Sequence, residues 1–236
     1  MGSHYGLKIV EDCSAPLARQ EQVFAHSLVD NLKALELIAP LVSYPKGAVL
    51  FMEGQKACGI FAMCSGQVKL STSSPDGKTM ILKIAETGDL LGLPSTLSGK
   101  PYELSAEVSE RAHVHFVPRG AFLRYLRANP EAFFQVAQLL TENHYAWHRM
   151  IQSLGLSHSA TGRLAQFILG WSTDHARGQD RFQIPLTHEE IGEMIGVTRE
   201  TVTRMLAIFK RKNFLVAKDA MVNIRNRAAL QGLAST

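Results

Sequence analysis

The chain has few of the features that would place it outside the cell or in a membrane. Its 236 residues include only three cysteines, Cys13, Cys58 and Cys64. An odd number without a short paired spacing does not form a disulfide framework, and it fits a reducing cytoplasm. An iron–sulfur cluster with four thiolate ligands is not expected, because one ligand is missing. No apolar run approaches the roughly 20 residues that span a membrane.

The sequence also lacks the signatures of common enzyme classes. His188 and Glu189 begin like a zinc-protease HExxH motif, but position 192 is glycine, so the second histidine is missing. The chain contains no GxSxG, Walker or GxGxxG motif. Its first residues, MGSHYGLKIVEDC, do not have the basic-then-apolar layout of a signal peptide. We therefore expect a cytoplasmic protein that is not an enzyme and holds no metal.

Positive charge is concentrated at one end of the chain. The net charge is +4, from 25 lysine and arginine residues against 21 aspartate and glutamate residues. From Leu156 to Thr236 there are 11 basic and 7 acidic residues, which leaves 14 of each kind before Leu156. All of the excess lies in the last third, and a basic segment beside a neutral body favours nucleic acid as a partner.

Two short helices with a tight turn between them are predicted within that basic third. Thr187 is an N-cap candidate with Glu190 three residues later, the pattern of a capping box. Gly196 suits the left-handed end of this first helix. Thr198 can cap a second helix, so residues 186–213 read as a helix-turn-helix.

The predicted second helix has two different faces. Its apolar face, expected to be buried, consists of Val202, Met205, Leu206 and Phe209. Its polar face consists of Arg199, Glu200, Thr203, Arg204 and Lys210. The arginines can donate to guanine, the glutamate can accept from cytosine N4, the threonine can meet a thymine methyl group or a phosphate, and the lysine suits phosphate. Three residues at the helix starts complete the candidate DNA-binding set: Thr187, His188 and Thr198. The alternative interpretation is a solvated amphipathic helix.

Earlier in the chain, short β-rich runs recur between turn signals from Leu41 to Pro118. Their spacing is near the 8–12 residues typical of an antiparallel sandwich or barrel. The turn Pro75-Asp76-Gly77 predicts a hairpin between residues 68–72 and 79–84. Before this region we predict an arm over residues 1–26 and a short helix over residues 27–38.

Helical periodicity returns at Arg119 and dominates from Pro130 to Leu154. Residues at heptad spacing, all of them apolar except Asn143, predict a dimer seam of Phe133, Val136, Leu140, Asn143, Trp147, Met150 and Leu154. The alternative is one helix packed on its own domain. Residues 155–159 are the predicted helix break and hinge. After it we predict a helix over 160–171, a polar loop over 174–180, a hairpin of 214–217 with 221–224, and a closing helix over 226–233.

These parts, in this order, resemble the cyclic-AMP receptor protein/fumarate–nitrate regulator (CRP/FNR) superfamily of bacterial transcription factors. The resemblance rests on residues 76–82 (DGKTMIL), 87–89 (TGD), 161–165 (TGRLA), 190–192 (EIG) and 199–204 (RETVTR). It implies an α+β protein with a double-stranded β-helix (jelly roll) sensor domain over 27–128, a dimerisation helix over 129–155 and a winged helix-turn-helix over 156–236. It also implies a homodimer on a near-palindromic TGTGA-like DNA site, read by Arg199, Glu200 and Arg204, with RNA polymerase as a further partner.

The sequence departs from the cyclic-AMP-binding members at the effector pocket. Leu93 stands where their ribose-binding glutamate would be, and Leu104 stands where their phosphate-binding arginine would be. Losing that bidentate pair to a buried phosphate costs on the order of 2–5 kcal/mol. We therefore expect that cyclic AMP is not the effector. The candidate pocket residues are Leu91, Gly92, Leu93, Leu97, Leu104, Ser105, Ala106, Trp147 and His148.

Two interpretations of such a pocket remain. Its apolar residues could line a site for an apolar ligand or haem, with His148 or His144 as the axial ligand. Alternatively, the leucines close the pocket and the protein acts without a ligand.

Overall fold

The computed structural model describes residues 40–156 and 159–235. The chain forms two compact units, one ending at His144 and the other, here called the C-terminal unit, starting at Tyr145. The predicted arm over 1–26 and helix over 27–38 lie outside the described residues. Within the described part, no helix combines the length and the apolar character needed to cross a membrane.

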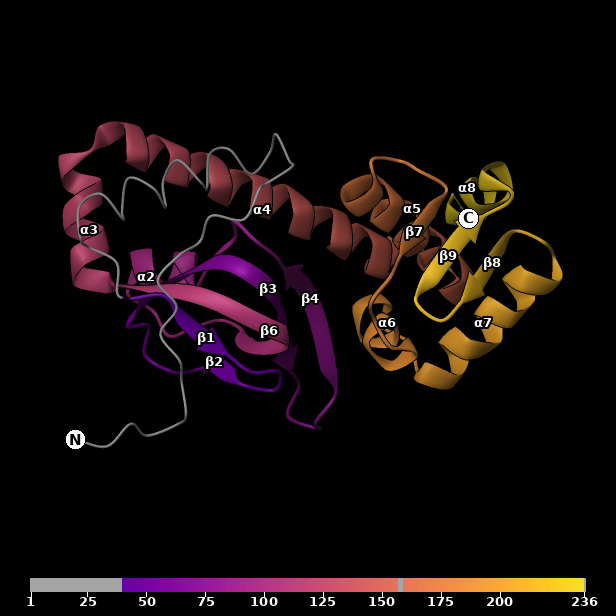
Figure 1. Ribbon diagram of the computed structural model, residues 1–236, viewed down its shortest axis with the longest axis horizontal. Helices are drawn as coiled ribbons and strands as arrows, with labels where there is room; N and C mark the ends of the chain where they lie inside the picture. Colours follow the sequence, from indigo (N-terminus) through magenta and orange to yellow (C-terminus); the bar gives the residue numbers. More distant parts are fainter. Residues whose placement is uncertain (1–39, 157–158, 236) are drawn as a thin grey trace. The chain divides into compact units, whose positions relative to one another are not determined.

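The first unit is built on a six-stranded antiparallel sheet, here called the β-roll (Figure 1). Its strands are β1 (Val42–Tyr44), β2 (Val49–Phe51), β3 (Gly59–Ser73), β4 (Thr79–Ala85), β5 (Leu90–Leu91) and β6 (Ser105–Pro118). The order is β1-β6-β3-β4, with β2 added to β6 and β5 to β3. The long strands β3 and β6 pair through several β-bulges, which bend a sheet. The expected hairpin is confirmed, because β3 pairs with β4 across the turn at Gly77.

Two separate apolar cores hold this unit together. The first lies within the β-roll and includes Phe51, Phe61, Leu91 and Tyr102. The second joins the sheet to three helices: α2 (Leu93–Ser98), α3 (Arg119–Ala128) and α4 (Pro130–Leu156). Its members are Ile60, Leu93, Val117, Phe122, Tyr125, Leu126, Ala132 and Val136. The N-terminal turns of α4 are therefore held against the β-roll by side chains of its own chain.

The long helix α4 corrects two predictions. Val136 is only 1% exposed and packs in the second core, so it is not available to a partner helix as the heptad pattern predicted. The helix also continues through Gly155 to Leu156, where a break was predicted. A single glycine lowers helix stability by only about 1 kcal/mol relative to alanine, which does not end a long helix. The remaining hinge positions 157 and 158 lie outside the described residues.

The C-terminal unit combines helices with a small sheet (Figure 1). Its helices are α5 (Ala160–Ala176), α6 (His188–Ile195), α7 (Arg199–Arg211) and α8 (Arg227–Ala234). Strands β7 (Arg181–Gln183), β8 (Leu215–Lys218) and β9 (Met221–Ile224) form an antiparallel sheet in the order β7-β9-β8. The predicted hairpin and closing helix are confirmed. The loop predicted over 174–180 is shorter, because α5 runs to Ala176 and ends at a left-handed Arg177.

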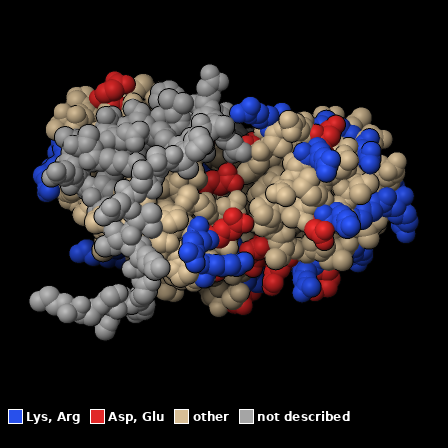
Figure 2. Space-filling model, in the orientation of Figure 1, with Lys and Arg blue, Asp and Glu red and all other residues tan. Residues whose placement is uncertain are grey.

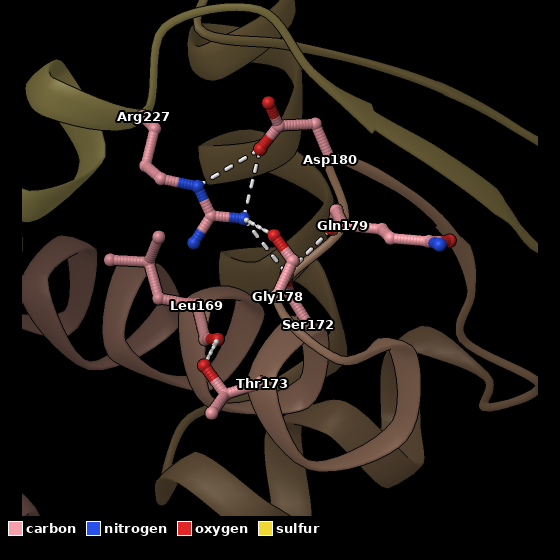
Figure 3. Close-up of polar contacts among 7 residues, drawn as sticks. All are labelled: Leu169, Ser172, Thr173, Gly178, Gln179, Asp180 and Arg227. Atoms are coloured by element: carbon pink, nitrogen blue, oxygen red, sulfur yellow. Dashed lines mark hydrogen bonds and ion pairs between the residues drawn. The ribbon is translucent and has the colours of Figure 1, made fainter.

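A polar cluster fastens α8 to the turn between α5 and β7 (Figure 3). The Nε and Nη2 atoms of Arg227 lie 2.9 and 2.8 Å from Oδ1 of Asp180. Nη2 also donates to the Ser172 hydroxyl at 2.8 Å and to the Gly178 carbonyl at 3.0 Å. The fully buried Ser172 hydroxyl in turn donates to the carbonyl of Gln179 at 2.6 Å. Helix α8 is thus joined to the turn between α5 and β7 through one guanidinium group.

Candidate nucleic-acid interface

Helix α6 begins with the capping box that the sequence predicts. The Glu190 amide donates to the Thr187 hydroxyl at 3.2 Å, and the Thr187 amide donates to the Glu190 carboxylate at 2.8 Å. The helix ends at Gly196, whose φ of 68° is the left-handed conformation expected there. The turn to α7 is tight enough that a Cβ on Gly192 would lie 2.6 Å from the Val197 carbonyl oxygen. The prediction of two helices and a short turn is confirmed.

Helix α7 presents the two faces that its spacing predicts. The apolar side chains are buried: Val202, Met205, Leu206 and Phe209. The polar side chains are all exposed: Arg199, Glu200, Thr203, Arg204 and Lys210. Thr198 caps the helix by accepting from the amide of Thr201 at 3.3 Å. The buried face fixes the helix on its unit and leaves its polar face open to a partner.

The charges of this face suit the contacts assigned to them. Hydrogen bonds from its own backbone amide and from the Thr198 side chain hold the pKa of Glu200 below its usual value, with a smaller contribution from Arg199. The carboxylate is therefore ionised at neutral pH and acts only as a hydrogen-bond acceptor, as a contact with cytosine N4 requires. Lys210 and Arg211 lie in the last turn of α7, and Lys212 follows it. Figure 2 shows Lys and Arg side chains spread over the C-terminal unit on the face in view.

One contact between α6 and α7 was not predicted. Nδ1 of His188 lies 2.8 Å from the Thr203 hydroxyl, which also donates to the Arg199 carbonyl at 3.0 Å. Both residues belong to the candidate DNA-binding set, but no sequence pattern pairs them. The two residues are 15 positions apart, and only the fold of the turn brings them together.

The candidate effector pocket is divided between the two apolar cores. Leu91 and Ala106 belong to the core inside the β-roll, whereas Leu93 and Leu97 belong to the core under α3 and α4. Leu104 is half-buried. Leu91 and Leu93 are 2% and 1% exposed, so their side chains are packed against protein. The structure therefore does not gather these leucines around one cavity.

A buried tyrosine lies beside Gly92 of the candidate effector pocket. The Tyr102 ring stacks on Phe51 with centroids 4.1 Å apart, and its hydroxyl donates to the Gly59 carbonyl at 2.6 Å. A Cβ on Gly92, which has a φ of 73°, would lie 2.6 Å from Cε1 of this ring. Burial raises the pKa of Tyr102 above its ordinary value, so the phenol stays neutral near pH 7. Tyr102 is not among the predicted pocket residues, because it lies between the segments 91–93 and 104–106 that the family resemblance assigns to the pocket.

The polar groups near Ser105 do not form a phosphate site. The Ser105 hydroxyl accepts from the Glu53 amide at 3.0 Å. The Glu53 carboxylate accepts from the Thr72 hydroxyl at 3.0 Å and from the Ser73 amide at 3.3 Å. The Glu53 carboxylate is thus bound to β3, and Leu104 offers none of the cationic donors that a buried phosphate requires.

Trp147 and the two histidines considered as axial ligands are all solvent-exposed. Trp147 and His148 belong to the C-terminal unit, and both are exposed, as is His144 in the first unit. Across residues 40–156 and 159–235, no group of three or more His, Cys, Asp or Glu side chains could hold a metal ion.

Comparison with known proteins matches both units. The model of the cyclic nucleotide-binding domain matches residues 41–129, and the model of the Crp-like helix-turn-helix domain matches residues 162–233. The transcriptional activatory protein AadR of Rhodopseudomonas palustris is 27% identical over 203 residues, covering 85% of this chain and 83% of that protein. The CRP-like cAMP-activated global transcriptional regulator of Mycobacterium tuberculosis is 26% identical over 193 residues, covering 80% and 86%.

Solved structures show the same fold. FixK2 from Bradyrhizobium japonicum superimposes with a TM-score of 0.73 at 23% identity, covering 84% of this chain and 98% of that chain. A CooA mutant from Carboxydothermus hydrogenoformans has a TM-score of 0.74 at 20% identity, covering 88% and 95%. Fold and relatives together define a transcription regulator that joins a cyclic nucleotide-binding-type domain to a DNA-binding helix-turn-helix, not an enzyme. The chain belongs to the CRP/FNR family of transcriptional regulators.

Proposed function

We propose that this regulator binds a near-palindromic, TGTGA-like DNA site as a homodimer, without requiring cyclic AMP. The observation that carries the DNA-binding proposal is the exposed polar face of α7, with Arg199, Glu200 and Arg204 outward and the apolar face buried. In a two-fold dimer, two such helices enter successive major grooves about 34 Å apart. RNA polymerase as a second partner, and the cytoplasm as the location, follow from this role.

The dimer proposal rests on an exposed apolar side of α4. Phe133, Phe134, Tyr145 and Ile151 are 57%, 59%, 61% and 68% exposed. At about 100° per residue, these positions fall within about a third of the helix circumference. Large apolar side chains gathered on one side mark a surface for association. Two residues of the predicted heptad seam, Phe133 and Trp147, lie in or near this apolar side. Leu140 packs against the protomer's own second core. Three further members of the seam are half-buried: Asn143, Met150 and Leu154.

Independence from cyclic AMP rests on the β-roll. Leu93 is packed in a core, Tyr102 covers Gly92, and Leu104 supplies no cationic group beside Ser105. Each of these features removes or opposes a contact that a cyclic nucleotide phosphate or ribose requires. The same packing gives no support to haem or to an apolar ligand, because the leucines fill two cores. The β-roll then serves to hold α4 rather than to receive a nucleotide.

Fluorescence anisotropy tests both parts of this proposal. The purified protein is titrated onto a palindromic TGTGA–TCACA duplex and a scrambled duplex at fixed salt, with and without saturating cyclic AMP. We expect specific binding of equal affinity in both conditions. Equal affinity for the two duplexes would contradict the DNA-reading role. Binding only with cyclic AMP would contradict the interpretation of Leu93 and Leu104.

A further inference from the structure

The Thr203 hydroxyl is held on its protein side by two partners from different helices. It lies 3.0 Å from the Arg199 carbonyl oxygen of its own helix and 2.8 Å from Nδ1 of His188 on α6. A threonine hydroxyl has a single proton. In one arrangement the hydroxyl donates to the Arg199 carbonyl oxygen and accepts a hydrogen bond from a protonated Nδ1 of His188. In the other, the hydroxyl donates to an unprotonated Nδ1 of His188. In both arrangements the proton is directed into the protein.

The second partner also fixes which branch of the side chain faces outward. Threonine in a helix divides between two χ1 rotamers, because its hydroxyl can bond the carbonyl four residues earlier. A hydrogen bond from a different helix favours the rotamer that keeps the hydroxyl at both partners. The γ-methyl group is then the part of this exposed side chain that remains for an approaching base. Thymine is the base that offers a methyl group in the major groove.

We propose that His188 is a positioning residue that makes Thr203 recognise the methyl group of one thymine in the half-site. His188 acts through the Thr203 rotamer and not by contacting that base. This inference rests on the proposed DNA-binding function and deepens it, since it assigns the chemistry read at one base pair. Of the two partners that the sequence left open for Thr203, this proposal assigns the thymine methyl group and not a phosphate.

The test replaces each half-site thymine, one at a time, with deoxyuridine, which lacks only the methyl group. Binding is measured by anisotropy as the ratio of affinities for the thymine and deoxyuridine duplexes. For the unmodified protein we expect a loss of about fourfold at one position, the worth of one buried methyl group. Thr203→Val keeps a methyl group and should keep this ratio. Thr203→Ser keeps the hydroxyl, lacks the methyl group and should bring the ratio to about one.

Variants at His188 separate positioning from direct contact. His188→Ala should lower the discrimination ratio to below about twofold, because the Thr203 rotamer is released. His188→Asn places an amide near the Nδ1 position and should restore the ratio. His188→Gln carries its amide one bond further out and should not restore the ratio.

Failure of the positioning role and failure of the proposed DNA-binding function give different results. A His188→Ala protein that keeps the full fourfold ratio overturns the positioning role, while specific binding of the parent duplex still supports the proposed function. A protein that binds no sequence specifically overturns both. Circular dichroism melting of each variant checks that the turn is folded. We expect parent-like melting of the His188 variants, because His188 is exposed and its substitution opens no cavity.

Discussion

Arg227 and Asp180 meet through two guanidinium nitrogens and one carboxylate oxygen, although 47 residues separate them in the chain. The same guanidinium group contacts the buried Ser172 hydroxyl. We expect Arg227→Ala to lower the free energy of unfolding of the C-terminal unit by about 1–3 kcal/mol, the range for a hydrogen bond to a charged group.

Urea unfolding followed by tryptophan fluorescence measures this loss. The chain has two tryptophans, Trp147 and Trp171, and both belong to the C-terminal unit. Arg227→Lys keeps the charge but lacks the fork of donors, so it should recover only part of the stability. Arg225→Ala, at an exposed position two residues earlier, is the control. An unchanged midpoint for Arg227→Ala would show that the cluster contributes nothing.

Arg199→Ala should reduce affinity for the specific duplex by about 1–3 kcal/mol and relax the preference at one base pair. The reason is that a forked contact to guanine discriminates among bases, whereas a phosphate contact does not. The measurement is anisotropy on a set of duplexes with each half-site base changed in turn. Arg211→Ala is the comparison and should weaken all duplexes alike. If Arg199→Ala also weakens them all equally, the residue does not read a base.

Lys210→Ala should weaken binding to all sequences and flatten the dependence of affinity on salt. A phosphate contact releases about 0.9 of a counterion, so the slope of log affinity against log salt should fall by about one unit for each protomer. Titrations between about 50 and 200 mM salt measure the slope. Lys100→Ala, in the first unit, should leave it unchanged. A Lys210 variant with the parent slope would remove this lysine from the phosphate contacts.

Ile151→Glu should weaken the dimer at least about tenfold, a change of about 1.4 kcal/mol. Ile151 is 68% exposed on the apolar side of α4, and a charge there would be buried against the partner helix. Sedimentation equilibrium measures the dissociation constant. Val216→Glu introduces the same charge at another exposed apolar residue, 45% exposed on β8, and should leave the dimer intact. Equal effects of the two changes would contradict a dimer through α4.

Tyr102→Phe should lower the free energy of unfolding by about 1 kcal/mol at pH 7, because the Gly59 carbonyl loses one buried hydrogen bond and keeps the one from the Thr96 hydroxyl. Burial raises the pKa of Tyr102 above that of the unfolded chain. The stability contributed by the neutral phenol is therefore complete below about pH 10 and is lost as the pH rises through the folded pKa. The urea midpoints of the variant and the parent should therefore differ at pH 7 and converge at alkaline pH. Tyr145→Phe, at an exposed tyrosine, should change neither midpoint.

Local patterns predicted the C-terminal unit well because its signals are short-range. The capping pair Thr187 and Glu190 and the left-handed Gly196 are each determined by a few neighbouring residues. The apolar face of α7 follows from helical spacing alone. By contrast, β7 has only three residues and is paired to β9, so its neighbours in the sequence carried no signal.

The less accurate predictions involve long-range packing. Heptad spacing assigns Val136 to an apolar face of α4. It does not indicate whether that face is covered by the β-roll of the same chain or by the helix of a second protomer. The second core of the protein's own first unit covers this face, a cluster that also contains Ile60 of β3 and Val117 of β6. The pocket leucines were likewise found by alignment to a motif, which does not reveal that Leu91 and Leu93 enter different cores.

The contact between His188 and Thr203 has a consequence for how the targets of such regulators diverge. In the role proposed for His188, a residue on α6 sets the chemistry that a residue on α7 presents. Two chains with identical α7 sequences could then prefer different half-sites after one substitution at position 188. Half-sites inferred by matching α7 alone would then miss the contribution of position 188 in this chain.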